Sequence, residues 1–274
     1  MAHPAAPLPA NIIDMMHDAL AAAGTALDGV AILTDTLAID GFFEADAAPD
    51  LSAAFSAHPI DIAVTPVDTR RKSLLIADMD STIITSESLD DLARLSGKGD
   101  AVAEITARSM RGELDFAGSL IERVKMIAGA PASLIQTIID DAVCNEGAEA
   151  LVATMRAHGA RTILASGGFT FLTSVIHARL GFDEHYANTL LLDGDQILGQ
   201  VSLPILDQNA KRERLDQTTA AMGISPHDVI TVGDGANDRG MTERAGIGVA
   251  YRGKDALKAV ADVCLDHADL RGLL

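Results

Sequence analysis

The pair Asp78 and Asp80 is the part of this sequence best suited to chemistry. Both aspartates follow the apolar run Leu74–Ala77, which is typical of a buried strand. In an extended chain, residues two positions apart point to the same side, so the two carboxylates would repel each other. A divalent cation with oxygen ligands would offset this repulsion, and one carboxylate could then act as a nucleophile. Taken alone, the pair is equally consistent with two solvated aspartates in an ordinary turn.

A second polar turn follows the expected strand Thr162–Ala165. Ser166, Gly167 and Gly168 come next, and a helix is expected directly after them. Free backbone N–H groups at a helix N-terminus, together with the helix dipole, suit a bound phosphate. By itself the triplet is more often a helix cap with a flexible turn.

A third polar turn carries Asp234 between two glycines, after the expected strand Val229–Val232. Glycine neighbours would let this carboxylate approach a metal ion closely. Lys211 lies near the start of an expected helix, and its flexible ammonium group could reach a phosphoryl group during transfer. A lone lysine or a lone turn means little, but these pieces in this order on one sheet favour phosphoryl-transfer chemistry.

Helices and strands alternate from Gly147 onward, which predicts a parallel sheet with right-handed crossovers. Before that point, four helical segments separated by glycines predict an insertion directly after the first strand. The expected helices are 87–96, 100–112, 115–129, 131–138, 148–157, 169–180, 209–222, 236–245 and 254–261. The expected strands are 74–78, 162–165, 190–192, 196–201, 229–232, 247–250 and 263–265, of which the third and fourth form a hairpin.

The first 69 residues have a different character, with ten acidic side chains and no lysine or arginine. Their pattern predicts a small α+β module without a catalytic constellation. Its expected elements are a helix at 11–23, strands at 30–34 and 37–39, a weak helix at 50–57 and a strand at 60–67. Arg70, Arg71 and Lys72 then arrive together, and a linker between domains is favoured over a phosphate-binding patch.

The composition is that of a globular protein, with 48% hydrophobic and 22% charged residues among 274. The formal net charge of −18 argues against nucleic acid or an anionic membrane as a partner, and a phosphate substrate would need local positive groups. Cys144 and Cys264 are isolated, which predicts free thiols in a reducing cytoplasm. No basic residue precedes Arg70 and no long uncharged apolar stretch occurs, so neither a basic signal peptide nor a transmembrane helix is expected.

Four motifs of this sequence together resemble those of the haloacid dehalogenase superfamily of aspartate-nucleophile phosphatases. They are Asp78-Met79-Asp80-Ser81-Thr82, Ser166-Gly167-Gly168-Phe169, Lys211 and Gly233-Asp234-Gly235-Ala236-Asn237-Asp238. The resemblance spans about residues 74–265. It implies an α/β fold with a Rossmann-like parallel sheet in residues 71–274 and a four-helix cap inserted at about 85–146. Residues 1–70 resemble the small ACT-like α+β modules found on such enzymes, although a convincing first strand is lacking.

The resemblance also implies a mechanism. Asp78 would be the nucleophile, Asp80 the general acid and base, and Lys211 a catalytic cation that stabilises the transferred phosphoryl group. Mg²⁺ would be held by Asp78, Asp234 and the backbone carbonyl of Asp80. Asp238 would position Lys211 or a water molecule bound to the metal.

The cap resembles that of the branch of the superfamily that hydrolyses L-phosphoserine to L-serine and phosphate, the last step of serine biosynthesis, which implies this activity. Glu87 would pair with the substrate ammonium group and Arg123 with the substrate carboxylate. The residues expected to bind the substrate are Glu87, Met110, Phe116, Arg123, Ser166, Gly167 and Asn237.

Two residues depart from the pattern of the superfamily. Arg239 stands where an apolar residue is usual, and Glu146 stands where a proline is common. Two other functions are also left open. The first is an enzyme of the same fold, which passes the phosphoryl group to another alcohol such as homoserine or acts on another small phosphomonoester. The second is an amino-acid-binding regulator with a vestigial phosphatase domain. The complete set of Asp, Ser and Lys positions argues against the regulator, and a homodimer is left open.

Overall fold

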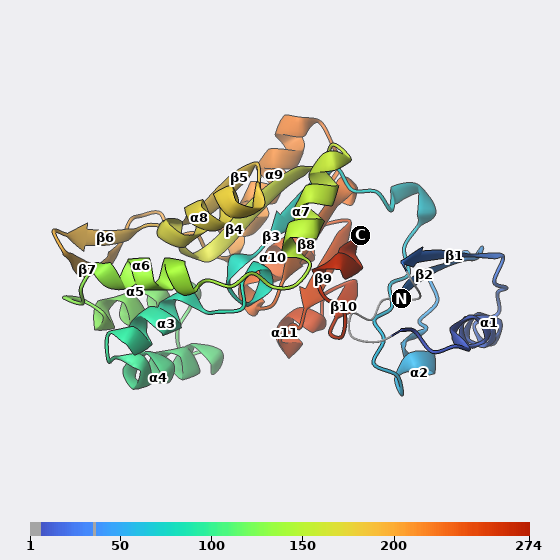
Figure 1. Cartoon of the computed structure of the whole chain (residues 1–274), viewed down its shortest axis with the longest axis horizontal. Coiled ribbons are helices and arrows are strands. Elements are labelled where there is room, and N and C mark those ends of the chain that lie inside the picture. Colours follow the sequence, from blue (N-terminus) through green and yellow to red (C-terminus); the bar gives the residue numbers. More distant parts are fainter. Residues whose placement is uncertain (1–6, 35–36) are drawn as a thin grey trace.

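The computed structural model describes residues 7–34 and 37–274, and a six-stranded parallel sheet forms its centre (Figure 1). The strands are β3 (Leu74–Ala77), β4 (Arg161–Phe169), β5 (Glu184–Asn188), β8 (Val229–Gly233), β9 (Ile247–Tyr251) and β10 (Val263–Leu265). Their order is β10–β9–β8–β3–β4–β5, and every neighbouring pair is parallel. The predicted α/β fold with a Rossmann-like sheet is confirmed.

The central strand β3 is buried on both faces. Leu75 and Ala77 belong to one apolar cluster, whereas Leu74 and Ile76 belong to another, as expected when successive side chains alternate. The first cluster includes side chains of α7 (Ala148–Ala157) and α8 (Thr170–Leu180), and the second includes side chains of α9 (Gln208–Met222) and α10 (Arg239–Thr242). Helices on both faces explain why β3 is a continuous apolar run.

The carboxyl end of β3 lies where the chain order in the sheet changes direction. The chain continues from β3 to β4 and β5 on one side, and later to β8, β9 and β10 on the other. Ala77 is the register partner of both Leu164 in β4 and Val232 in β8. Ligands of open α/β sheets bind at such a switch point, outside the carboxyl ends of the strands.

The four helices expected between β3 and α7 are present and lie at one end of the molecule (Figure 1). They are α3 (Ser88–Leu95), α4 (Gly99–Met110), α5 (Phe116–Met126) and α6 (Ser133–Asp141). The hairpin of β6 (Leu190–Asp193) and β7 (Gln196–Val201) joins them. Ile197 exchanges backbone hydrogen bonds of 2.8 Å with Gly129 and Ala130, so the cap consists of four helices and this hairpin.

Two neighbouring linkers, residues 78–87 and 142–147, connect the four cap helices to the sheet. The Asn145 amide clamps them together, because its Nδ2 donates to the Thr82 carbonyl at 2.8 Å and to the Ile84 carbonyl at 3.1 Å. The next residue, Glu146, forms an ion pair of 3.0 Å with Arg271. The departure from proline at this position therefore adds a surface contact to the linker.

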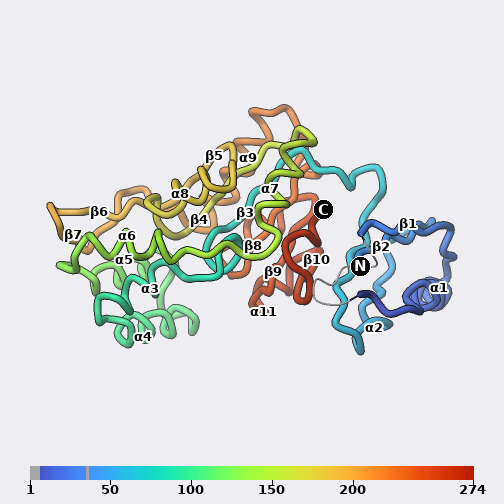
Figure 2. The backbone as a smooth tube through the Cα atoms, viewed as in Figure 1, coloured from blue at the N-terminus to red at the C-terminus, as the bar shows by residue number. Residues whose placement is uncertain are grey.

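Residues at the N-terminal end form a separate unit, on the side of the sheet away from the cap (Figure 2). Its elements are α1 (Ile12–Ala22), β1 (Gly29–Thr34), β2 (Ala38–Phe42) and α2 (Ser52–Phe55), and β1 and β2 are antiparallel. Its apolar cluster contains the buried residues Leu8, Ile12, Met16, Ala19, Ile39, Phe55 and Ile60. The predicted order of helix, two strands and helix is therefore confirmed, while the ACT-like character stays a prediction.

The strand predicted at 60–67 is wrong. The structure forms no strand there, and Val67–Thr69 is a 3-10 turn. Asp61 accepts backbone hydrogen bonds from residues 266–268 near the C-terminus instead. The Asp61 side chain thus attaches this segment to a distant part of the chain.

Strand β5 was missed because Glu184–Asn188 is too polar to show a strand pattern. Its Asn188 is the register partner of Phe169, so β4 runs through Ser166 and Gly167, where a turn was expected. Two expected helices are also shorter. The segment 236–245 is a 3-10 turn (Ala236–Asp238) followed by α10, and 254–261 contains only α11 (Asp255–Lys258).

The basic triplet before the sheet behaves as a linker. Arg70 pairs with Asp40 of the N-terminal unit, and the Lys72 ammonium donates to the His227 carbonyl at 2.7 Å. The departure Arg239 is exposed and pairs with Glu243 one helical turn later, at 2.8 Å. None of the helices in the described ranges combines the length and apolarity that a membrane span requires.

Candidate active site

The carboxyl ends of three neighbouring strands bring together residues that are far apart in the sequence. Asp78 follows β3 directly, Asp234 follows β8 directly, and Ser166 lies in the last part of β4. Because β4 and β8 flank β3, Asp78 lies between the other two. All three side chains are buried.

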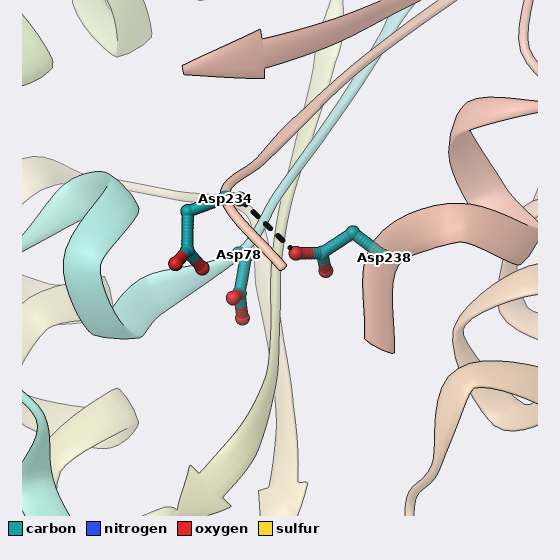
Figure 3. Close-up of side chains that lie close together, drawn as sticks. All are labelled: Asp78, Asp234 and Asp238. Atoms are coloured by element: carbon teal, nitrogen blue, oxygen red, sulfur yellow. Dashed lines mark hydrogen bonds between the residues drawn. The ribbon is translucent and has the colours of Figure 1, made fainter. Parts of the chain in front are cut away.

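Asp78, Asp234 and Asp238 form an acidic cluster (Figure 3). One carboxylate oxygen from each lies within 4.8 Å of the others. Oxygen ligands at this spacing fit a hard divalent cation, which would offset the repulsion among buried carboxylates. Two of the expected ligand side chains, those of Asp78 and Asp234, are thus together, and Asp238 joins them. The ligand role of the Asp80 carbonyl stays a prediction.

The turn after β8 holds Asp238 in the acidic cluster. The carboxylate Oδ2 of Asp238 accepts hydrogen bonds of 3.2 Å from the backbone N–H groups of Asp234 and Gly235, the first of which is drawn in Figure 3. A Cβ on Gly233 would lie 2.3 Å from the Asp238 carboxylate, so a side chain does not fit there. Asn237 folds over the same turn, with its Oδ1 2.6 Å from the place of a Cβ on Gly235.

Lys211 supplies the counter-charge of the acidic cluster and is only 1% exposed. Its Nζ donates to Oδ1 of Asp78 and to Oδ1 of Asp238, both at 2.7 Å. Asp207 caps α9 through its side chain, which starts the helix one turn before the lysine. Burial opposes the charge, but Asp238 and Asp78 together raise the pKa of Lys211 above its usual range. The lysine therefore remains an ammonium group that links two carboxylates.

Asp80 has surroundings of its own. Its Oδ1 accepts a hydrogen bond from the Ser88 backbone at 2.8 Å, and its Oδ2 accepts one from the Ser166 hydroxyl at 3.1 Å. A Cβ on Gly168 would lie 2.4 Å from Oδ2, so the glycine makes room for this carboxylate. Burial, followed by the charge of Asp78, raises the pKa of Asp80 to about 6. Asp78 and Asp80 are therefore differentiated: one is paired with an ammonium group and the other readily takes up a proton.

Gly167 lies between the sheet and the cap. A Cβ on Gly167 would lie 2.7 Å from the ring of Phe116, the first residue of α5. The Gly167 carbonyl accepts a 2.8 Å hydrogen bond from the Asn188 amide. The predicted phosphate-binding pair Ser166 and Gly167 and the predicted cap residue Phe116 therefore meet at this edge of the sheet.

Glu87 and Arg123 face the same region. The Ser81 hydroxyl donates to the Glu87 carboxylate at 2.8 Å. Glu87 remains exposed to solvent, but partial desolvation by the surrounding protein, followed by the charge of Asp80, raises its pKa to about 7. The Arg123 side chain is largely buried and lies 3.9 Å from the Asp90 carboxylate. Burial lowers the pKa of Arg123, and the charges of Asp90, Glu87 and Asp80 oppose this effect.

Met110 is the predicted substrate residue that the structure does not bring to the others. It is the last residue of α4 and is 77% exposed. A substrate contact would require α4 to move toward the sheet.

Residues 75–243, more than half of the chain, match the haloacid dehalogenase-like hydrolase family. The chain belongs to this family. The phosphoserine phosphatase of Methanocaldococcus jannaschii is 35% identical over 205 residues, which are 75% of this chain and 97% of that protein. The phosphoserine phosphatase of Archaeoglobus fulgidus is 38% identical over 216 residues, which are 78% of this chain but only 63% of that protein.

Solved structures of similar proteins lead to the same family. A phospho-aspartyl intermediate analogue of phosphoserine phosphatase superposes on this haloacid dehalogenase-like hydrolase with a TM-score of 0.70 at 35% identity, covering 74% of this chain and 97% of that one. The unliganded probable phosphoserine phosphatase from Vibrio cholerae gives a TM-score of 0.79 at 29% identity and covers 98% of this chain and 82% of that one. The second similarity includes the N-terminal unit.

Sequence reasoning gave no role to three residues at the site of this hydrolase. Ser81 holds Glu87 although its φ of 55° lies in the left-handed region, which is uncommon for serine. Ser88 donates its backbone N–H to Asp80. Lys254 contacts Asp234 at 3.0 Å. A serine inside the first motif could have drawn attention, whereas a lysine in a short loop carries no recognisable pattern.

Proposed function

We propose that this hydrolase is a Mg²⁺-dependent phosphoserine phosphatase, which converts L-phosphoserine and water into L-serine and phosphate. The observation that carries the proposal is the differentiation of two neighbouring carboxylates. Asp78 is held by Lys211, whereas the pKa of Asp80 is raised to about 6 by burial and by Asp78. Transfer of a phosphoryl group to and from a carboxylate requires an ionised nucleophile beside a group that can give and take up a proton.

In the first step, an oxygen of Asp78 attacks the phosphorus atom and the phosphorus–oxygen bond to serine breaks. Protonated Asp80 gives its proton to the departing serine oxygen. The products are free serine, an Asp78 aspartyl-phosphate and ionised Asp80. Lys211 and the Ser166 hydroxyl lie beside the two reacting carboxylates and would stabilise the charge of the group in transfer.

In the second step, ionised Asp80 takes a proton from a water molecule whose oxygen attacks the aspartyl-phosphate. The bond between phosphorus and the Asp78 oxygen breaks, phosphate leaves, and both carboxylates return to their starting states. Asp238 keeps Lys211 in place during both steps through its 2.7 Å contact.

Asp78, Asp234 and the Asp80 backbone carbonyl would hold Mg²⁺, whose charge would neutralise the repulsion between the nucleophile and the phosphate. The fit rests on the spacing of the acidic cluster, in which three carboxylate oxygens lie within 4.8 Å. The third of these, on Asp238, is already engaged by Lys211 and two backbone N–H groups. Asp238 therefore acts as a positioning residue.

The cap would read the serine part of the substrate. Glu87 would accept from the substrate ammonium group and Arg123 would pair with its carboxylate, while Phe116 beside Gly167 and Asn237 beside Gly235 would also contact the substrate. Movement of the cap about the linkers that Asn145 clamps would bring Met110 inward and exclude bulk water during the covalent stage. The homodimer and the cytoplasmic location stay predictions.

The test is a turnover assay with L-phosphoserine and Mg²⁺ that measures phosphate and serine together. We expect equal amounts of both products, little release in excess chelator, and recovery on adding Mg²⁺. Hydrolysis of other phosphomonoesters but not of phosphoserine would contradict the proposed substrate. Phosphorylated homoserine as the main product when homoserine is present would identify a phosphotransferase, and no turnover of any phosphomonoester would favour a regulatory role.

A further inference from the structure

Lys254 makes two contacts with Asp234, one through its backbone and one through its side chain. Its backbone N–H donates to the Asp234 carbonyl at 2.8 Å, and its Nζ lies 3.0 Å from the Asp234 Oδ2. The short loop between β9 and α11 carries it, and Gly253 in that loop would place a Cβ only 2.9 Å from the Ala250 side chain. The lysine is thus tied to one carboxylate of the acidic cluster.

Lys211 and Lys254 form ion pairs with different carboxylates of the site. Lys211 forms ion pairs with Asp78 and Asp238. In the described part of the chain, Lys254 is the one basic side chain that forms an ion pair with Asp234. Removing Lys254 would therefore leave a nearly buried carboxylate beside Asp78 without an ion-pair partner and with only the charge of Lys211 nearby, which is costly until another cation arrives.

Lys254 also differs from Lys211 in its access to solvent. Its side chain is 59% exposed, compared with 1% for Lys211. It lines a pocket of about 400 Å³ together with Asp234, Glu87 and Ser81. An exposed ammonium group beside one ligand carboxylate can move away at little cost, whereas the enclosed Lys211 cannot.

We propose that Lys254 is a positioning residue that stabilises Asp234 before a divalent cation binds and thereby weakens the binding of that cation. The proposal rests on the cation site of the proposed function. The ammonium group and the divalent cation are both positive and act on the same carboxylate, so each lowers the benefit of the other. The lysine therefore sets a moderate metal affinity, which permits exchange of the cation.

The test compares Lys254→Met, which keeps the length and removes the charge, with wild type and with Lys254→Arg. Lys258→Met is the matched control, because Lys258 ends α11, the short helix that follows Lys254, and pairs with Asp266 at 2.8 Å. Mg²⁺ binding is measured by titration calorimetry at low ionic strength. We expect Lys254→Met to bind Mg²⁺ about three- to tenfold more tightly, and Lys254→Arg and Lys258→Met to stay within about twofold of wild type.

Thermal unfolding gives a second readout that does not depend on activity. The unfolding midpoint of Lys254→Met should fall in excess chelator and return toward the wild-type value in excess Mg²⁺, because the cation replaces the lost charge. An equal fall in both conditions, or unchanged or weaker Mg²⁺ binding, would overturn the proposal. Absence of Mg²⁺ binding in wild type would overturn the proposed cation site as well, whereas normal binding without phosphoserine turnover would contradict only the proposed substrate.

Discussion

Carboxylates are buried both at the active site and at the contact between the N-terminal unit and the C-terminal segment, but their binding partners differ. Asp61 is 7% exposed, and its two oxygens accept hydrogen bonds from three successive backbone N–H groups, those of residues 266–268, at 2.6–3.2 Å. Its charge is satisfied by main-chain groups that cannot titrate or leave. At the active site, Asp78 and Asp234 are paired with the ammonium groups of Lys211 and Lys254, and Asp80 accepts one backbone N–H, that of Ser88.

This difference separates a structural carboxylate from reactive ones. Asp61 joins the N-terminal unit to the C-terminal segment, and among the described residues no other carboxylate accepts from the same N–H groups. In the active site, burial and the neighbouring Asp78 raise the pKa values of both Asp80 and Asp234. Crowded carboxylates are costly to the fold, and they are retained where a proton, a cation or a phosphoryl group is exchanged.

The largest expected effect is the loss of turnover in Asp78→Asn. The amide keeps the size of the side chain but cannot attack phosphorus, and no other carboxylate follows β3 directly. Phosphate release from phosphoserine should fall to background while circular dichroism and the unfolding transition stay those of a folded protein. Turnover at the wild-type rate would remove Asp78 from the nucleophile role.

Asp80→Asn should lower kcat by about 10²–10⁴-fold, because the leaving serine oxygen no longer receives a proton from a positioned acid. The loss should be smaller for an aryl phosphate, whose leaving group needs less protonation. Equal losses for both substrates would indicate that the substitution disturbs the site and does not remove a general acid.

The same variant should gain stability in a pH-dependent manner. The pKa of Asp80 is about 6 in the folded protein and 3.8 is its ordinary value, so between these values the folded chain binds a proton that the unfolded chain does not. Lowering the pH through this window stabilises wild type, and the full cost of the buried charge is present above it. Asp80→Asn should therefore be more stable by on the order of 2–3 kcal/mol at pH 8 in chelator, with the difference vanishing near pH 4. Denaturant unfolding at both pH values measures it, and a constant difference would contradict the titration of Asp80.

Arg123→Ala should reduce kcat/KM for phosphoserine by roughly ten- to hundredfold, as expected for loss of a charge-assisted contact with a carboxylate. An aryl phosphate without a carboxylate should be affected much less. The alternative is that Arg123 supports the cap through Asp90, which lies 3.9 Å away. In that case both substrates would lose rate to the same extent.

The smallest effect on activity is expected at the N-terminal contact. Asp61→Asn should lower the free energy of unfolding by about 1.5–3 kcal/mol, because its amide group cannot accept from all three backbone N–H groups. Phosphoserine turnover should stay close to wild type, and so should that of a shortened chain beginning at Arg70, although its solubility can suffer. Asp68→Asn, in the exposed part of the same segment, is the matched control for stability. A folded Asp61→Asn protein without activity would show that the N-terminal unit completes the active site.

Much of the fold and of the site could be read from the sequence, because both depend on local patterns. Apolar runs followed by Asp78 and Asp234 predicted the strands that carry these residues, and glycines marked the ends of the cap helices. Local patterns fail to predict an element where a contact with a segment far away in the sequence determines the structure. The polar strand β5 forms because β4 pairs with it, and residues 60–67, whose pattern predicted a strand, are instead attached to the C-terminal segment by the Asp61 side chain.

What the sequence alone determined is the kind of chemistry, since nucleophile, acid, phosphate-binding turn and lysine are recognisable from residue type and order. The tertiary structure decided how charge is divided among them: which carboxylate Lys211 holds, that Asp80 is isolated near Ser166 and readily protonated, and that Lys254 contacts Asp234. Residue types can be read directly from the sequence. Proton affinity and ion pairing depend on distance and burial, which exist only after strands separated by more than a hundred residues have been brought to one edge of the sheet.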